Sequence, residues 1–312
     1  MFRLSPATVV TTPTMRHAAR SRLREERRTY FWFLIPSLIV LGTLSIVPLL
    51  VTIYLSLQNL NLTEPTLTGF AGLANFQQMV TDTTFWHSVE IALILIVVPV
   101  GVQMILGLSL ALLLFNQQPI VRLTRSLFIA PMVIPPVVAG LTWKILFIPN
   151  LGGINFFLGL VGITGPNWLD TPFWAIVSVC LVAIWENTPF VMLLVLAALE
   201  SMPEEPLEAA RVDGASATQT FRFITFPQLI PVLLVALLFR IIDALGIFPV
   251  IFVLTSGGPG RATTPLNYYA YTTGFTYLNI GYASALAVAL FILIAGISVM
   301  FMRLKLRAVH LE

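Results

Sequence analysis

Six long apolar stretches constrain this chain more than any other feature. A helix needs about 20 apolar residues to cross the hydrocarbon core of a bilayer. Stretches of that length occupy residues 31–57, 87–115, 125–148, 172–199, 228–254 and 281–303. Because lipid offers no partners for free backbone groups, each stretch must cross as a helix. The sequence therefore predicts an all-α integral membrane protein with six transmembrane helices.

The composition excludes several other classes of protein. Hydrophobic residues make up 57% of the 312 residues, and charged residues only 10%, against about 25% in a soluble domain. These values exclude a soluble globular protein and a disordered chain. The net charge of +3 is too small to indicate a nucleic-acid partner. Cys180 is the single cysteine, so no disulfide within the chain and no metal site are expected.

Basic residues are distributed unequally between the two sides of the predicted bundle. They gather in the tail before the first stretch, in loops 116–124 and 200–227, and after the sixth stretch. Loops 58–86 and 149–171 contain none, and the remaining loop has only Arg261. Since Lys and Arg concentrate in cytoplasmic loops, both termini are predicted to be cytoplasmic. The expected parts are a basic tail (1–30), a six-helix domain (31–303) and a C-terminal tail (304–312).

Prolines interrupt five of the six stretches. They are Pro36, Pro48, Pro99, Pro131, Pro135, Pro136, Pro189, Pro231 and Pro249. Membrane helices tolerate proline where neighbouring groups satisfy the freed carbonyls. Kinked helices around a cavity favour a transport path over a passive anchor.

The loop between the fourth and fifth stretches has the pattern of folded structure. Ser201 and Glu204 have the spacing of a capping box, followed by strong helix formers. Gly214 marks a turn. Residues 215–224 are predicted to form a second short helix that ends before Pro227. We therefore expect a helix–turn–helix bracket between two membrane spans.

The same loop carries a bipartite motif. The spacing Glu-Ala-Ala-x3-Gly-x9-Ile-x2-Pro is met by Glu208, Ala209, Ala210, Gly214, Ile224 and Pro227. It resembles the EAA loop of ABC importer permeases, here spanning residues 201–227, with Phe226 in place of the usual leucine.

Further segments extend this resemblance to about residues 30–305. Residues 185–190, 238–244 and 254–260 are similar to segments of carbohydrate-uptake permeases. Many relatives have an aspartate after the phenylalanine where this chain has Pro249 after Phe248. This departure puts a substrate role for that position in doubt.

The resemblance implies a transport complex rather than an enzyme. It implies a heterodimer with a second homologous permease, two ATP-binding subunits that dock on the EAA loop through Glu208, and an extracytoplasmic solute-binding protein. The solute would be a sugar or sugar-like molecule, with a trehalose- or maltose-like disaccharide favoured. The location would be the bacterial inner membrane. No cofactor is expected on this chain, since ATP and Mg would bind the partner ATPase.

The sequence has no ATP-binding motif of its own, which agrees with a separate ATPase subunit but leaves other energy sources open. The chain has no Gly-x4-Gly-Lys-Ser/Thr phosphate loop, and its only lysines are Lys144 and Lys305. Energy must come from another polypeptide, from an ion gradient or from nothing. A secondary, ion-coupled transporter is the alternative, but it predicts inverted repeats and we find no convincing repeat. An intramembrane enzyme lacks support, because the histidines lie outside the stretches or at their edges, and no catalytic residue is predicted.

Ionisable residues within membrane spans indicate function by default. Glu186, Arg240 and Asp243 are expected at one depth, near the middle of the fourth and fifth stretches. They could form an ion network that locks the bundle, a polar wall of the translocation cavity, or a proton relay. Asn187 could bind a sugar hydroxyl. Phe248 could stack on a sugar ring or belong to the interfacial aromatic belt.

Overall fold

The computed structural model describes residues 13–64, 68–115 and 119–309, and the chain folds as two units. The first unit, Met1–Tyr54, contains most of α1 (Pro13–Ser56). This helix continues through the predicted boundary at residue 30 and through Pro36 and Pro48. Its segment Leu34–Ser56 is apolar and long enough to cross a membrane, as predicted for the first stretch.

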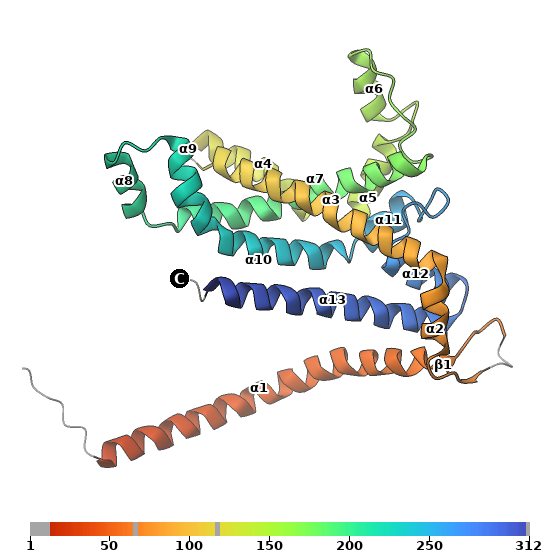
Figure 1. The fold of residues 1–312 in the computed structure, drawn as a ribbon, viewed down its shortest axis with the longest axis horizontal. Helices are drawn as coiled ribbons and strands as arrows, with labels where there is room; N and C mark the ends of the chain where they lie inside the picture. The colour runs from red at the N-terminus through yellow and green to blue at the C-terminus, as the bar shows by residue number, and fades with distance from the viewer. Residues whose placement is uncertain (1–12, 65–67, 116–118, 310–312) are drawn as a thin grey trace, which may run out of the picture. The chain divides into compact units, whose positions relative to one another are not determined.

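The second unit, Leu55–Glu312, is a helical bundle. Three long helices, α3, α7 and α10, pack side by side, and α13 lies along α10 (Figure 1). A two-stranded antiparallel sheet, β1 (Gln58–Asn59) with β2 (Gly69–Phe70), precedes the bundle. The helices are α2 (Ala74–Thr81), α3 (Thr83–Leu113), α4 (Pro119–Val133), α5 (Pro136–Leu146), α6 (Gly153–Leu160), α7 (Pro172–Glu200), α8 (Glu205–Val212), α9 (Ala217–Thr220), α10 (Phe226–Ala244), α11 (Phe248–Leu254), α12 (Leu266–Tyr271) and α13 (Ile280–Val309), with π-helical turns η2 (Phe221–Thr225) and η3 (Thr272–Thr276).

Apolar helices of membrane-crossing length confirm the predicted class. Besides the segment in α1, they are Thr83–Leu113, Pro172–Glu200, Ala217–Ala244 and Ile280–Met300, with one bent pair, Leu123–Val133 and Pro136–Leu146. If the bent pair counts as one span, the described residues contain six. The all-α membrane fold predicted from the sequence is therefore confirmed.

The third predicted span is not one continuous helix. Its two halves, α4 and α5, meet at 98°. Pro135 has an extended backbone at the break, with φ −58° and ψ 137°, and Pro136 begins α5. Two successive prolines explain the break, because each lacks an N–H donor and disfavours helical backbone in the residue before it.

The fifth predicted span, 228–254, is broken as well. Helix α10 ends at Ala244, and α11 begins at Phe248 after a turn in which the Gly246 amide donates to the Asp243 carbonyl at 2.8 Å. The two short helices beyond the breaks, α5 and α11, pack against each other. The Lys144 ammonium of α5 donates to the Val253 carbonyl of α11 at 2.9 Å and ties them together.

Close packing holds α3 against α7. A Cβ added to Gly107 would lie 2.5 Å from the Val191 Cβ and 3.1 Å from the Met192 amide nitrogen. Val191, Met192 and Val195 are fully buried. Glycine at position 107 therefore lets the two helix backbones approach closely, as small residues do in membrane helix pairs.

Asp82 caps α3 at the end of the bundle away from α8 and α9. Its Oδ1 accepts from the Thr84 amide at 2.8 Å. Its Oδ2 accepts from the hydroxyls of Tyr269 and Tyr282 at 2.6 and 2.7 Å. Burial by itself raises the pKa of this carboxyl, but the hydrogen bonds from the two tyrosines and Thr84 together hold the pKa below its usual value. The charged form therefore joins α3, α12 and α13.

We expect Asp82→Ala to lower the free energy of unfolding in detergent by about 2 kcal/mol, because it removes a helix cap and two buried hydrogen bonds. Since the folded pKa is lowered, the charge contributes stability that is fully present above the usual pKa of 3.8 and is lost as the pH falls through the lowered value. Thermal unfolding of the wild type and Asp82→Asn between about pH 5 and pH 2 measures this. The stability difference between them should shrink with acidity; a constant difference would contradict the assignment.

Candidate functional site

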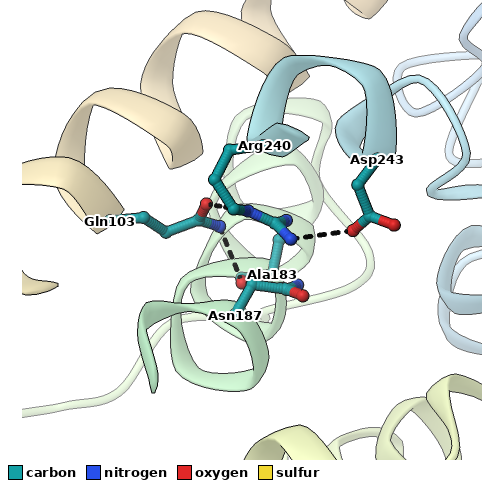
Figure 2. A network of polar contacts seen from close by, with 5 residues as sticks. All are labelled: Gln103, Ala183, Asn187, Arg240 and Asp243. Atoms are coloured by element: carbon teal, nitrogen blue, oxygen red, sulfur yellow. Dashed lines mark hydrogen bonds and ion pairs between the residues drawn. The ribbon is translucent and has the colours of Figure 1, made fainter. Parts of the chain in front are cut away.

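A small polar pocket lies where the two broken spans are interrupted. It has a volume of about 90 Å³. Its polar side chains come from three packed helices. Figure 2 shows Gln103 on α3, Asn187 on α7, and Arg240 and Asp243 on α10, and Glu186 on α7 also lines the pocket. Residues at the two breaks complete its lining, namely Pro136, Gly246, Ile247 and Pro249.

Arg240 is the centre of the hydrogen bonds in this pocket. Its side chain is 6% exposed, and its Nη1 pairs with the Asp243 Oδ2 at 2.9 Å. Its Nε donates to the Gln103 Oε1 at 3.0 Å. The guanidinium carbon also lies 5.9 Å from the centre of the Phe190 ring. The Asp243 side chain is 64% exposed, so the ion pair has one buried and one open member.

Gln103 is a member that the sequence reasoning did not identify. It is 1% exposed, and its Nε2 donates to the Ala183 carbonyl at 2.9 Å while its Oε1 accepts from Arg240. The available signal was a polar amide in the middle of an apolar stretch, which must find partners when buried. Gln103 is uncharged, so a rule based on charged residues within membrane spans does not identify it.

The structure brings all three predicted ionisable residues to one pocket, but they are not equally connected. Glu186 is 6% exposed. Within the described part of the chain its carboxyl group forms no ion pair or hydrogen bond, and so it does not join Arg240 and Asp243 in a closed cluster. Asn187 uses its amide nitrogen to donate to the Ala183 carbonyl at 3.0 Å (Figure 2).

Phe248 lies in a cluster of aromatic rings and does not line the polar pocket. Its ring stacks on Phe252 at 5.6 Å between centroids and meets Tyr271 at 4.9 Å and Tyr268 at 5.7 Å. The structure therefore separates this candidate from Glu186, Asn187, Arg240 and Asp243.

The loop between α7 and α10 has the predicted bracket, with one correction at its start. No capping box forms at Ser201 and Glu204, because α8 begins only at Glu205 and the Ser201 hydroxyl donates back to the Ala198 carbonyl at 3.0 Å. Pro203 explains this, since it disfavours helical backbone in the residue before it. Gly214 has φ +73°, which confirms the predicted turn.

The second half of the bracket differs from the prediction in how it ends. A capping box joins Ser216 and Gln219 at the start of α9. The chain then continues through η2 directly into α10, with Pro227 in the first turn of that helix. Pro227 thus starts a helix instead of ending one, because the first turn does not need its N–H.

The motif residues of the bracket divide into a buried anchor and an exposed face. Ala210 is 5% exposed and accepts from the Ala215 amide at 2.9 Å. Glu208 and Ala209 are exposed on α8, as is Pro227 at the start of α10. Ile224 is half-buried in η2. An exposed acidic side chain beside a small residue leaves room for another surface to approach closely.

Within the residues that the structure describes, neither an apolar cavity nor a metal-binding group offers an alternative to the polar pocket as the candidate site. A larger cavity of about 460 Å³ lies between α3, α4 and α7 and has a mostly apolar lining. Among residues 13–64, 68–115 and 119–309, no group of three or more His, Cys, Asp and Glu is arranged to hold a metal ion.

Comparison with known proteins decides the family. Residues 103–306 match the family described as binding-protein-dependent transport system inner membrane component. The chain belongs to this family of ABC importer permeases. The matched range includes the five polar side chains of the pocket and the whole of the bracket, which we call the EAA loop (201–227) after the motif that it carries.

Relatives support this over nearly the whole permease. It is 38% identical to the probable ABC transporter permease protein y4oQ of Sinorhizobium fredii, over 92% of this chain and 93% of that protein. It is 34% identical to the trehalose/maltose transport system permease protein MalF of Thermococcus litoralis, over 91% of this chain and 96% of that protein. A solved bacterial alginate ABC transporter, in complex with an alginate pentasaccharide-bound periplasmic protein, shares the fold, with a TM-score of 0.75, 20% identity, and coverage of 93% and 95%.

Membership of this family fixes two properties of the permease. It is an inner-membrane component, in agreement with its apolar helices. It is a membrane-spanning subunit without catalytic activity of its own, since ATP hydrolysis in ABC transporters resides in a separate subunit.

Proposed function

We propose that the permease forms part of the import path for a neutral sugar or sugar-like solute, with a trehalose- or maltose-like disaccharide favoured. The observation that carries the proposal is the polar pocket at the interrupted middle of the bundle. The names of relatives add to it, since these include permeases of trehalose/maltose and trehalose transport systems.

The charges around the pocket favour a neutral solute. Its lining contains one cation, Arg240, and two carboxyl side chains, Glu186 and Asp243. The guanidinium already donates to Gln103 and Asp243. An anionic solute would find its cation engaged and two acids nearby. Sugar hydroxyls both donate and accept, so they match the exposed carboxylate of Asp243 and the amide of Asn187.

The size of the pocket indicates that this chain supplies only one wall of the path. A volume of about 90 Å³ is room for a few water molecules, whereas small-molecule sites have about 300–1,000 Å³. A second homologous permease, forming a heterodimer with this one, would complete the cavity. Asp243, exposed within a single chain, would face that cavity.

The EAA loop is the proposed attachment point for the motor. Two ATP-binding subunits would dock on the cytoplasmic face, and Glu208 on the exposed side of α8 would contact one of them. Both termini would then be cytoplasmic, as the basic residues predict. ATP and Mg would bind the ATPase subunits, and this chain would need no cofactor. A solute-binding protein would deliver solute to the opposite face.

Reconstitution in liposomes tests the proposal. The permease, its partner permease and the two ATPase subunits should take up radiolabelled trehalose or maltose when ATP and the solute-binding protein are present. Omission of the ATPase should remove uptake. Gradient-driven uptake by the lone chain would contradict the proposal and support a secondary transporter instead.

A further inference from the structure

Arg125 joins three helix ends at the end of the bundle that carries the EAA loop. Its Nε and Nη2 both donate to the Leu114 carbonyl, at 3.0 and 2.7 Å. Leu114 directly follows α3 and is its C-cap residue. The Nη1 of Arg125 pairs with the Glu200 Oε1 at 2.8 Å, and Glu200 is the last residue of α7. Arg125 itself belongs to α4, and its side chain is only 20% exposed.

We propose that Arg125 is a positioning residue for energy coupling, which holds the ends of α3 and α7 together so that movement of the EAA loop displaces both helices as one body. This inference rests on the proposed function, because it assumes that an ATPase moves the loop. Helix α8 begins at Glu205, shortly after the last residue of α7, so a pull on the loop reaches the bundle at the end of α7 as well as through η2 into α10.

A second contact joins the same two helices near the polar pocket. Gln103 of α3 donates to the Ala183 carbonyl of α7. Ala183 and Glu200 lie about 25 Å apart along α7, at 1.5 Å per residue. Between the two contacts, Gly107 and Val191 lie in direct contact range. Helices tied at three points between the pocket and their C-terminal ends are expected to move together there, and this pair contributes Gln103, Glu186 and Asn187 to the pocket.

The chemistry requires arginine at this position. A planar guanidinium can donate two hydrogen bonds to one carbonyl and a third to a carboxylate, whereas an ammonium cannot reproduce that fork. The positive charge also suits the C-terminal ends of α3 and α7, where free carbonyls carry partial negative charge. Loss of the Glu200 side chain leaves both bonds to Leu114, so Glu200→Ala separates the link between helices from the cap on α3.

The test uses the complete transporter in liposomes and measures solute uptake and ATP hydrolysis per assembled complex. Glu200→Ala is expected to lower the ratio of solute moved to ATP hydrolysed by about fivefold, and Arg125→Gln by more, since changes along a coupling route act over this range. Arg125→Lys should fall between Arg125→Gln and the wild type. The matched control is Asp170→Asn, which removes an exposed carboxylate just before the other end of α7 and should leave the ratio unchanged.

Two outcomes would overturn the inference in different ways. If the wild type transports and all Arg125 and Glu200 variants keep its ratio, with only their abundance reduced, Arg125 merely caps a helix. If the wild-type complex hydrolyses ATP but moves no sugar, the proposed function fails and this inference fails with it.

Discussion

Replacing Arg240 with methionine is expected to lower solute uptake about 10-fold, because leaving a buried polar group without its hydrogen-bond donor costs roughly 1–3 kcal/mol. The side chain is 6% exposed and supports both Gln103 and Asp243. Without it, the buried Gln103 Oε1 loses its donor and two acids remain near each other without a cation. Uptake into cells or liposomes, normalised to permease in the membrane, measures the loss.

Asp243→Asn is the companion variant that separates the two main interpretations of this pocket. Because the Asp243 side chain is 64% exposed, asparagine there can accept from Arg240 without burial of a new group. We expect normal abundance and reduced uptake if Asp243 forms a wall of the translocation cavity. Normal uptake per molecule with lower abundance would instead show that the pair only locks the bundle.

Replacing Gly107 with alanine is expected to destabilise the permease by about 2–3 kcal/mol, since overpacking a tight contact costs this much. The new Cβ would lie 2.5 Å from the Val191 Cβ, so α3 and α7 must separate. This cost exceeds the helix-propensity gain of about 1 kcal/mol for alanine over glycine. The midpoint of thermal unfolding in detergent should fall.

Gly101→Ala is the matched control on the same helix. Nothing lies within 4 Å of the position that its Cβ would take. Only the propensity gain then acts, and the unfolding midpoint should stay level or rise. A second change, Val191→Gly, should partly rescue Gly107→Ala by removing the atom that the new Cβ meets. Equal stability of Gly107→Ala and Gly101→Ala would refute the close contact.

Apolar length predicted the membrane helices because each needs only its own residues to be recognised. The breaks at Pro135 and Gly246 are harder to predict from the sequence, because a proline in a helix can cause either a kink or a complete interruption. Pro36 and Pro48 lie inside one unbroken helix, whereas Pro135 and Pro136 stand at a 98° bend. Two prolines in direct succession break the helix at residues 135–136, whereas the break at residues 245–247 lies next to the packing of α5 on α11, which no local pattern encodes.

The site shows the same division between local and long-range information. The i, i+3 spacing of Arg240 and Asp243 predicted an ion pair correctly, since both lie on one helix. Gln103 joins Arg240 across 137 residues of sequence, and a single chain offers no signal for such a partner. At Ser201 a local pattern predicted wrongly. The spacing of Ser201 and Glu204 fits a capping box, but Pro203 between them prevents it and α8 begins at Glu205.

The two interruptions beside the polar pocket have a mechanical consequence. Beyond them, α5 and α11 are tied by Lys144 and Val253, and on the near side α3, α7 and α10 are packed together. Residues 134–135 and 245–247 act as paired joints between these two parts, where few backbone torsions can absorb a large rotation. We expect the pocket to widen or narrow through rotation at these two positions, with few changes inside the helices on either side. If an ATPase drives the bundle, as proposed above, its work would then go mainly into turning the two short helices α5 and α11.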